Sequence, residues 1–183
     1  PWGEVNRRYG EKAGELENIA RFNPLSILDP ESPHYADDLA YLSDALIVTQ
    51  GNDPHFDNSA RELVAGLISF VVERYGEKAT LNMVKVLLSK PADELVSVAL
   101  LAQKFEEKSI ARRKLGRFAL FSKENTSIIS TALTQTAFLD SNELGKSLSF
   151  SDFDFKALIE GCNTIYLVLP VDKLQIYGRW LRL

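Results

Sequence analysis

The feature that most limits the fold of this chain is a single strand-like run near its C-terminus, residues 164–169 (TIYLVL). β-Branched, aromatic and leucine residues follow one another there with little polar interruption, which is typical of a strand covered on both faces inside a parallel sheet. The preceding residues offer no comparable strand. Because the backbone N–H and C=O groups of a strand need a neighbouring strand, we expect the partners of this segment to lie outside the chain.

The rest of the chain predicts helices, and the clearest of them lies in its first half. It is expected to begin at Asp57 or Asn58, whose side chains can cap free backbone N–H groups, and to end before Gly76. We expect its apolar face to be the centre of the core. The residues on that face are Leu63, Val64, Leu67, Ile68, Val71, Val72 and Tyr75.

Other segments carry the same three- and four-residue apolar spacing. Helices are predicted after Pro33, from Thr80 to Leu88, after Pro91, around an interruption at Gly116, from Asn125 or Thr126, from Ser151 or Asp152 to about Glu160, and over residues 172–180. Residues 140–147 are predicted to be a loop. The chain is therefore expected to be mainly α, a compact bundle of about six to eight helices with a C-terminal strand stub.

Composition places the chain among ordinary globular proteins. It has 183 residues, of which 45% are hydrophobic and 25% charged, enough for one domain with a real core. Its net charge of -4 argues against a surface devoted as a whole to nucleic acid. No apolar run reaches the roughly 20 residues that span a bilayer, so no membrane contact is expected. Cys162, the single cysteine, excludes an internal disulfide and is interpreted as a buried, unreactive thiol in a cytosolic protein.

The sequence shows no recognisable active site. Residues 75–80 (YGEKAT) lack the second glycine of a phosphate-binding loop, and no G-x-S-x-G motif is present. The spacing of the histidines and nearby acids matches no standard metal site, so we interpret them as loop and capping residues. They are His34, His55, Asp37, Asp38, Asp53 and Asp57. We therefore predict no catalytic, cofactor-binding or metal-binding residue in this chain.

The most basic stretch is residues 111–118 (ARRKLGRF), which contains Arg112, Arg113, Lys114 and Arg117. Such a cluster can bind phosphates or an acidic partner, and that binding would weaken steeply with salt. The alternative is a solvated helix face whose charge is balanced by nearby glutamates. The four basic residues are our candidates for partner or nucleic-acid binding.

Seven segments, read in order, resemble the coupling proteins of type IV secretion, the TraG/VirD-type conjugation ATPases. They are PWGEV, RFNPLSILDP, ADDLAYLSDALI, HFDNSARELVAGLISFVV, TAFLDS, SFSDFDF and TIYLVLPVDKLQIYGRWLRL. In that family an all-α domain is inserted into a RecA-like nucleotide-binding domain. The resemblance implies that residues 1–28 are a stub or linker from the host domain, 29–161 the all-α domain, and 162–183 the strand and helix that return to the host.

The resemblance also implies where the chemistry lies. The family's Walker A and Walker B motifs would fall outside this chain, so the fragment is not expected to be an enzyme, whereas the parent is expected to be a hexameric ATPase using ATP and magnesium at the cytoplasmic face of the inner membrane. Matching positions are interpreted as fold and hinge residues. They are Asn23, Pro24, Leu25, Phe56, Ala60, Arg61, Pro170 and Arg179.

In the family the all-α domain is thought to meet the cargo. The resemblance therefore implies a domain that docks effector proteins or relaxase and relaxosome components for delivery to the secretion channel. Two alternatives stay open: a module that contacts the transferred DNA through Arg112, Arg113, Lys114 and Arg117, and a domain that regulates assembly of the parent hexamer.

Overall fold

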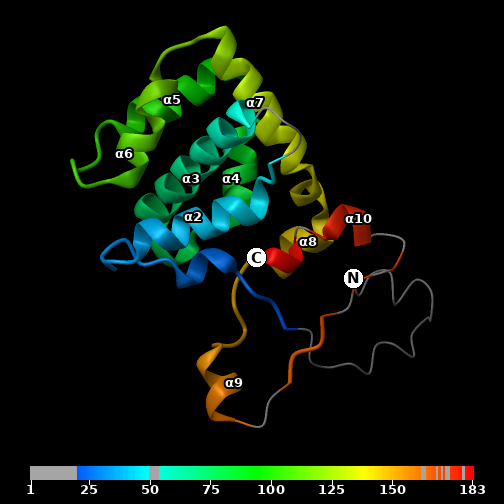
Figure 1. Cartoon of the computed structure of the whole chain (residues 1–183). Coiled ribbons are helices and arrows are strands. Elements are labelled where there is room, and N and C mark those ends of the chain that lie inside the picture. Colours follow the sequence, from blue (N-terminus) through cyan, green and yellow to red (C-terminus); the bar gives the residue numbers. More distant parts are fainter. Residues whose placement is uncertain are drawn as a thin grey trace.

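A computed structural model describes residues 20–49, 54–161, 164–167, 169, 171, 174–178 and 180–183. The long helix α3 (His55–Tyr75) stands at the centre of a helical body (Figure 1). Helices α2 (Tyr35–Leu46), α4 (Leu81–Leu88), α6 (Ile110–Leu115) and α7 (Lys123–Gln135) all contact it, and α5 (Ala92–Ala102) packs on α6. The prediction of a mainly α fold is confirmed.

Shorter elements connect and extend this body. Among the described residues, five are 3-10 turns: η2 (Pro24–Ile27), η3 (Gly76–Lys78), η4 (Gly116–Ala119), η5 (Ala137–Asp140) and η7 (Trp180–Arg182). The same part of the chain also contains three short helices: α8 (Asn142–Ser147), α9 (Lys156–Glu160) and α10 (Leu174–Tyr177). In Figure 1, α9 lies below the helical body. The last described residues return to the body, since η7 contacts α2 and Tyr177 packs against the core.

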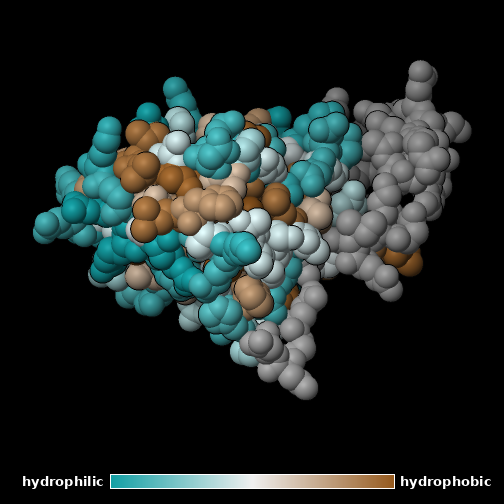
Figure 2. All heavy atoms as spheres, turned by 90° about the horizontal axis from the view of Figure 1, so that it is seen from above, coloured by the Kyte–Doolittle hydropathy of each residue, from teal (hydrophilic) through white to brown (hydrophobic). Residues whose placement is uncertain are grey.

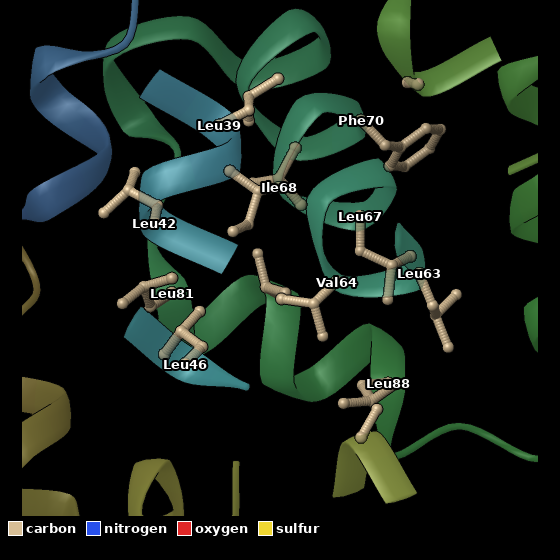
Figure 3. Close-up of a cluster of buried hydrophobic side chains, with 14 of the residues drawn as sticks. Leu39, Leu42, Leu46, Leu63, Val64, Leu67, Ile68, Phe70, Leu81 and Leu88 are labelled. Carbon is tan, nitrogen blue, oxygen red and sulfur yellow. The ribbon is translucent and has the colours of Figure 1, made fainter. Parts of the chain in front are cut away.

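The apolar face of α3 is the centre of the core, as the sequence predicted. Leu63, Leu67 and Ile68 are fully buried. Ile68 points toward Leu39 and Leu42 of α2 (Figure 3). Tyr75 was predicted to belong to this face, but it is 46% exposed. Its place in the last turn explains this, because Gly76 then adopts a positive φ of 55° and turns the chain away.

The start of α3 differs from the prediction. The helix begins at His55 directly after Pro54, two residues before the expected cap at Asp57. Proline fixes a φ suited to a helix start and lacks the N–H that a cap would satisfy. Asp57 is instead buried in the first turn, where its carboxylate accepts a 2.6 Å hydrogen bond from the side-chain amide of Gln135.

Two further predictions near the C-terminus are corrected. Residues 142–147, predicted to be a loop, form α8, because the Ser141 hydroxyl accepts a hydrogen bond from the Leu144 N–H and starts a helix. The helix expected from Ser151 or Asp152 begins only at Lys156. Both residues are drawn away from a capping role by contacts with residues 21–26.

The predicted strand is not formed by the described part of residues 164–169. Residues 164–167 and 169 have no strand conformation, and Tyr166 and Leu167 are 83% and 63% exposed. The physical reason is that these described residues have no adjacent strand to pair with. The expectations for Asp53, Cys162, Pro170 and Arg179, and those for residues 1–19, lie outside the described residues.

Candidate functional site

A cleft of about 1230 Å³ opens on the surface of the helical body. Four segments that are distant in sequence line it. They are residues 23–36, the end of α3 with η3, residues 104–113, and residues 150–151. The cleft is therefore a product of the tertiary fold, assembled where the first described residues meet the end of the central helix.

A buried hydrogen-bond chain lies beside the cleft. The Tyr35 hydroxyl donates to the Ser69 hydroxyl at 3.2 Å, and Ser69 in turn donates to the Glu73 carboxylate. The same carboxylate oxygen accepts from the Ala111 N–H at 3.4 Å, which ties α6 to α3. Burial of the Tyr35 ring raises the pKa of its hydroxyl to about 12, so this residue is a neutral hydrogen-bond donor at physiological pH.

An ion pair joins two of the lining segments at the solvent edge of the cleft. The Lys108 ammonium lies 3.0 Å and 3.1 Å from the two carboxylate oxygens of Glu31. The two side chains are 66% and 75% exposed. Hydrogen bonding to Glu31, together with its negative charge, raises the pKa of Lys108. Because exposed pairs of this kind are weak and screened by salt, the link is easily broken.

Three of the four predicted basic residues are engaged within the molecule. The Lys114 ammonium lies 2.5 Å from the Glu62 carboxylate, and the Arg117 guanidinium 3.1 Å from that of Glu124. Arg112 donates from its guanidinium to the Phe105 carbonyl at 3.1 Å. These contacts reduce the positive charge that the run can offer to phosphates, although its role in partner or nucleic-acid binding stays a prediction.

Arg113 differs from its three neighbours. Its side chain is exposed, lines the cleft, and has no ion pair or hydrogen bond among the described residues. The structure therefore separates one member of the basic run from the others and places it with residues that no sequence motif indicates. The most informative of these are Tyr35 and the consecutive residues Lys104 and Phe105, from two distant places in the chain.

Residues that precede most of the helical body in the sequence meet residues that follow it in a second feature, which we call the neck clasp. It is formed by residues 21–26 and 147–153. The Phe22 N–H donates to the Ser147 carbonyl at 2.9 Å and the Asp152 N–H to the Arg21 carbonyl at 3.0 Å. The Arg21 guanidinium also donates to the Asp152 carboxylate at 3.0 Å, which lowers the pKa of that carboxyl group.

The fold also explains two of the positions singled out by the family resemblance. The buried Asn23 side chain accepts from the Leu25 N–H and donates to the Ala79 carbonyl at 2.7 Å, anchoring the start of the helical domain. Arg61 pairs with Asp44 and donates to the Ile47 carbonyl, so it holds the end of α2 against α3. Both are structural roles.

The described histidines and acids do not converge on a metal site. No group of three or more histidine, cysteine or acidic side chains is arranged to hold an ion within the described part of the chain. The His55 ring lies 3.2 Å from the Glu124 carboxylate, and Asp57 contacts Gln135. In that same part of the chain, no helix combines the length and the apolar character needed to cross a bilayer.

A third feature is an apolar patch on the surface. Seen from above, hydrophobic residues gather in the middle of one face, between hydrophilic margins (Figure 2). Leu120 and Phe121, in the connection that leads into α7, are 77% and 69% exposed. They border a shallow depression between α5 and the start of α7. This connection is far in sequence from the segments that form the neck clasp.

No local sequence signal identifies the cleft. Phe105 and Tyr35 fit equally well as ordinary core residues, and indeed Phe105 stacks on Phe70 with ring centroids 5.3 Å apart. Lys104 is one of several charged residues in a polar connection. The only clue was the basic run itself, which contains Arg113, but the sequence could not distinguish this residue from the three that form internal contacts.

Comparisons with known proteins identify the family. Neither curated proteins nor solved structures gave a match to the chain. A family model described as type IV secretory system conjugative DNA transfer matches residues 13–183. The match covers the central helical body, both sides of the neck clasp and the C-terminal residues. This chain therefore belongs to the type IV secretory system conjugative DNA transfer family.

Proposed function

We propose that this chain is the cargo-docking domain of a type IV secretion coupling ATPase, and that the cleft receives a segment of an effector or relaxosome protein. The observation that carries the proposal is the cleft itself, which combines apolar surface with two cationic side chains that have no internal counter-ion among the described residues. Family membership supplies the context, because a conjugative transfer protein must engage what it transfers.

The size and lining of the cleft suit a peptide segment. Pockets for small ligands hold roughly 300–1,000 Å³, and this cleft, at about 1230 Å³, exceeds that range. Its apolar part includes Leu28, Ile110 and the ring of Phe105. An extended segment could place one or two apolar side chains against these residues while its backbone remains partly solvated.

The charges of the cleft indicate what such a segment should carry. Lys108 is paired with Glu31, whereas the side chains of Lys104 and Arg113 have no hydrogen bond or ion pair among the described residues. The lining also carries five carboxylates, so its formal charge is negative overall; they belong to Asp29, Glu31, Glu73, Glu77 and Glu106. We therefore expect a cargo segment whose acidic side chain, next to its apolar ones, lies against Lys104 and Arg113 and away from these carboxylates.

The remaining parts of the proposal concern the parent protein. We propose that ATP and magnesium are bound by a RecA-like domain beyond this chain, that the parent is a hexamer at the cytoplasmic face of the membrane, and that this fragment hydrolyses no ATP. Residues 164–169 would then pair with strands of that domain. The exposed Tyr166 and Leu167 support this, because paired strands would cover them.

The test is a binding titration of the chain against a protein secreted by the same system, with its targeting segment present or deleted. Arg113→Glu combined with Lys104→Glu should weaken binding of the intact cargo by at least tenfold, since like charges then face the acidic segment. Lys123→Glu is the matched control, because Lys123 is exposed and lies outside the cleft. Equal affinity for intact and deleted cargo would refute the docking function. A loss of affinity in Lys123→Glu as large as that in the double variant would refute the cleft as the binding site.

A further inference from the structure

The cleft and the neck clasp share residues. Asn23, Ser26 and Ser151 belong to the clasp, and all three also line the cleft. The Ser151 hydroxyl accepts a 3.1 Å hydrogen bond from the Asn23 N–H and lies 2.9 Å from the Ser26 hydroxyl. Part of the surface that would meet a cargo segment is therefore complete only while the clasp is closed.

The two halves of the clasp are held with unequal strength. Residues 23–28 are fixed to the helical body, because Asn23 is buried and bonded to the Ala79 carbonyl and Leu25 is 3% exposed. Residues 150–153 are attached mainly through exposed contacts. Asp152 pairs with Arg21 in the open, and the ring of Phe150, which lies 3.5 Å from the Arg21 guanidinium, is itself 44% exposed.

The weaker half also leads directly to the exposed C-terminal part of the chain. Phe153 and Phe155 continue the clasp by packing on Phe22, with ring centroids 5.8 Å and 4.8 Å from it. Residues 150–153, which we call the jaw, thus contact both the cleft and the segment leading to α9. Exposed ion pairs contribute little stability, so the jaw can detach without unfolding the helical core.

We propose that cargo binding in the cleft and closure of the neck clasp are thermodynamically coupled, so that the clasp reports cleft occupancy to the segment that follows it. This inference rests on the proposed docking function. A segment bound against Ser151 and Phe150 contacts the closed jaw but not the detached one, and a ligand stabilises the state with which it makes more contacts. Such coupling is reciprocal. If bound cargo raises the equilibrium constant for clasp closure by a given factor, the open clasp must have a cargo affinity that is lower by the same factor.

The first measurement follows the clasp by amide hydrogen exchange, using the backbone N–H groups of Phe22 and Asp152 that bridge its two halves. Asp152→Asn should accelerate exchange at both amides because it removes the charge that Arg21 binds. Asp154→Asn is the control, since it makes the same charge change in a residue whose side chain, among the residues that the structure describes, accepts only from the Lys156 N–H. Saturating cargo should slow exchange at both amides in the unaltered chain.

The second measurement is the affinity of each variant for the cargo protein used above. Asp152→Asn should weaken binding by about two- to fivefold, the range expected for loss of an exposed ion pair, and Asp154→Asn should leave it unchanged. If Asp152→Asn bound cargo with unchanged affinity, and cargo did not slow amide exchange in the unaltered chain, the coupling would be overturned while the docking function would stand. Absence of cargo binding by the unaltered chain would overturn both.

Discussion

The close approach of α3 and α6 makes a strong prediction at Gly66. A Cβ atom added at Gly66 would lie 2.8 Å from Leu115 Cδ2, closer than Cβ atoms approach other atoms in real proteins, and 3.1 Å from Lys114 Cβ, which is tighter than most such contacts. Leu115 is 1% exposed and has little room to move. Gly66→Ala should therefore force the two helices apart, even though alanine is otherwise favoured over glycine in a helix.

The expected magnitude follows from two opposing effects. Alanine gains about 0.5–1 kcal/mol over glycine in a helix interior, and overpacking a close contact costs about 1–3 kcal/mol. The net result should be a loss of about 1 kcal/mol in the free energy of unfolding. For a chain of this length that corresponds to a fall in Tm of about 2–4 °C.

Gly145 provides the matched control. It lies within α8, and a Cβ atom added there meets nothing within 4 Å. The same substitution at Gly145 should therefore raise the free energy of unfolding by up to about 1 kcal/mol. Urea unfolding followed by circular dichroism measures both variants under one set of conditions.

A double variant then tests the mechanism. Leu115→Ala alone should cost about 2–5 kcal/mol, as deletion of a buried leucine side chain does. Combined with Gly66→Ala it should cost less than the sum, because the new methyl group fills part of the space that Leu115 leaves. If Gly66→Ala stabilised the chain as Gly145→Ala does, the close approach of α3 and α6 would be refuted.

Two further predictions concern the core and the cleft. Leu67→Asp places a carboxylate at a fully buried position and should abolish the cooperative thermal transition, whereas the same change at the 51% exposed Leu100 should cost no more than about 1 kcal/mol; a transition near the parent's for the Leu67 variant would contradict the placement of α3. Tyr35, whose pKa is raised to about 12, keeps its proton in the folded chain while the unfolded chain loses it near pH 10, so stability should fall as pH rises through this interval, by about 2–3 kcal/mol in total. Urea unfolding from pH 9 to 12 should show a shallower decline for Tyr35→Phe, and identical slopes would refute the assignment.

The core could be predicted from local pattern because burial repeats with the period of the helix. Leu63, Leu67 and Ile68 lie on one face of α3 at three- and four-residue spacing, and all are fully buried. The stop at Gly76 and the cap at Thr80 were likewise predictable, since both depend on the chemistry of one or two residues. The late start of the helix after Ser151 was not, because Ser151 and Asp152 are bound by residues distant in sequence. The helix at 142–147 was missed although its cap, Ser141, is a local signal of the same kind as Thr80.

The sequence by itself determined that this chain folds into amphipathic helices around a central apolar one, and its ordered segments resembled the family to which it belongs. Only the tertiary structure decided which charges are available to a partner. Arg112, Lys114 and Arg117 find internal acceptors, while Arg113 lines a cleft with residues from 23–36 and 150–151. The physical reason is that helix formation depends on residues a few positions apart, whereas ion pairing and cleft formation depend on residues as much as 131 positions apart, as in the contact between Arg21 and Asp152.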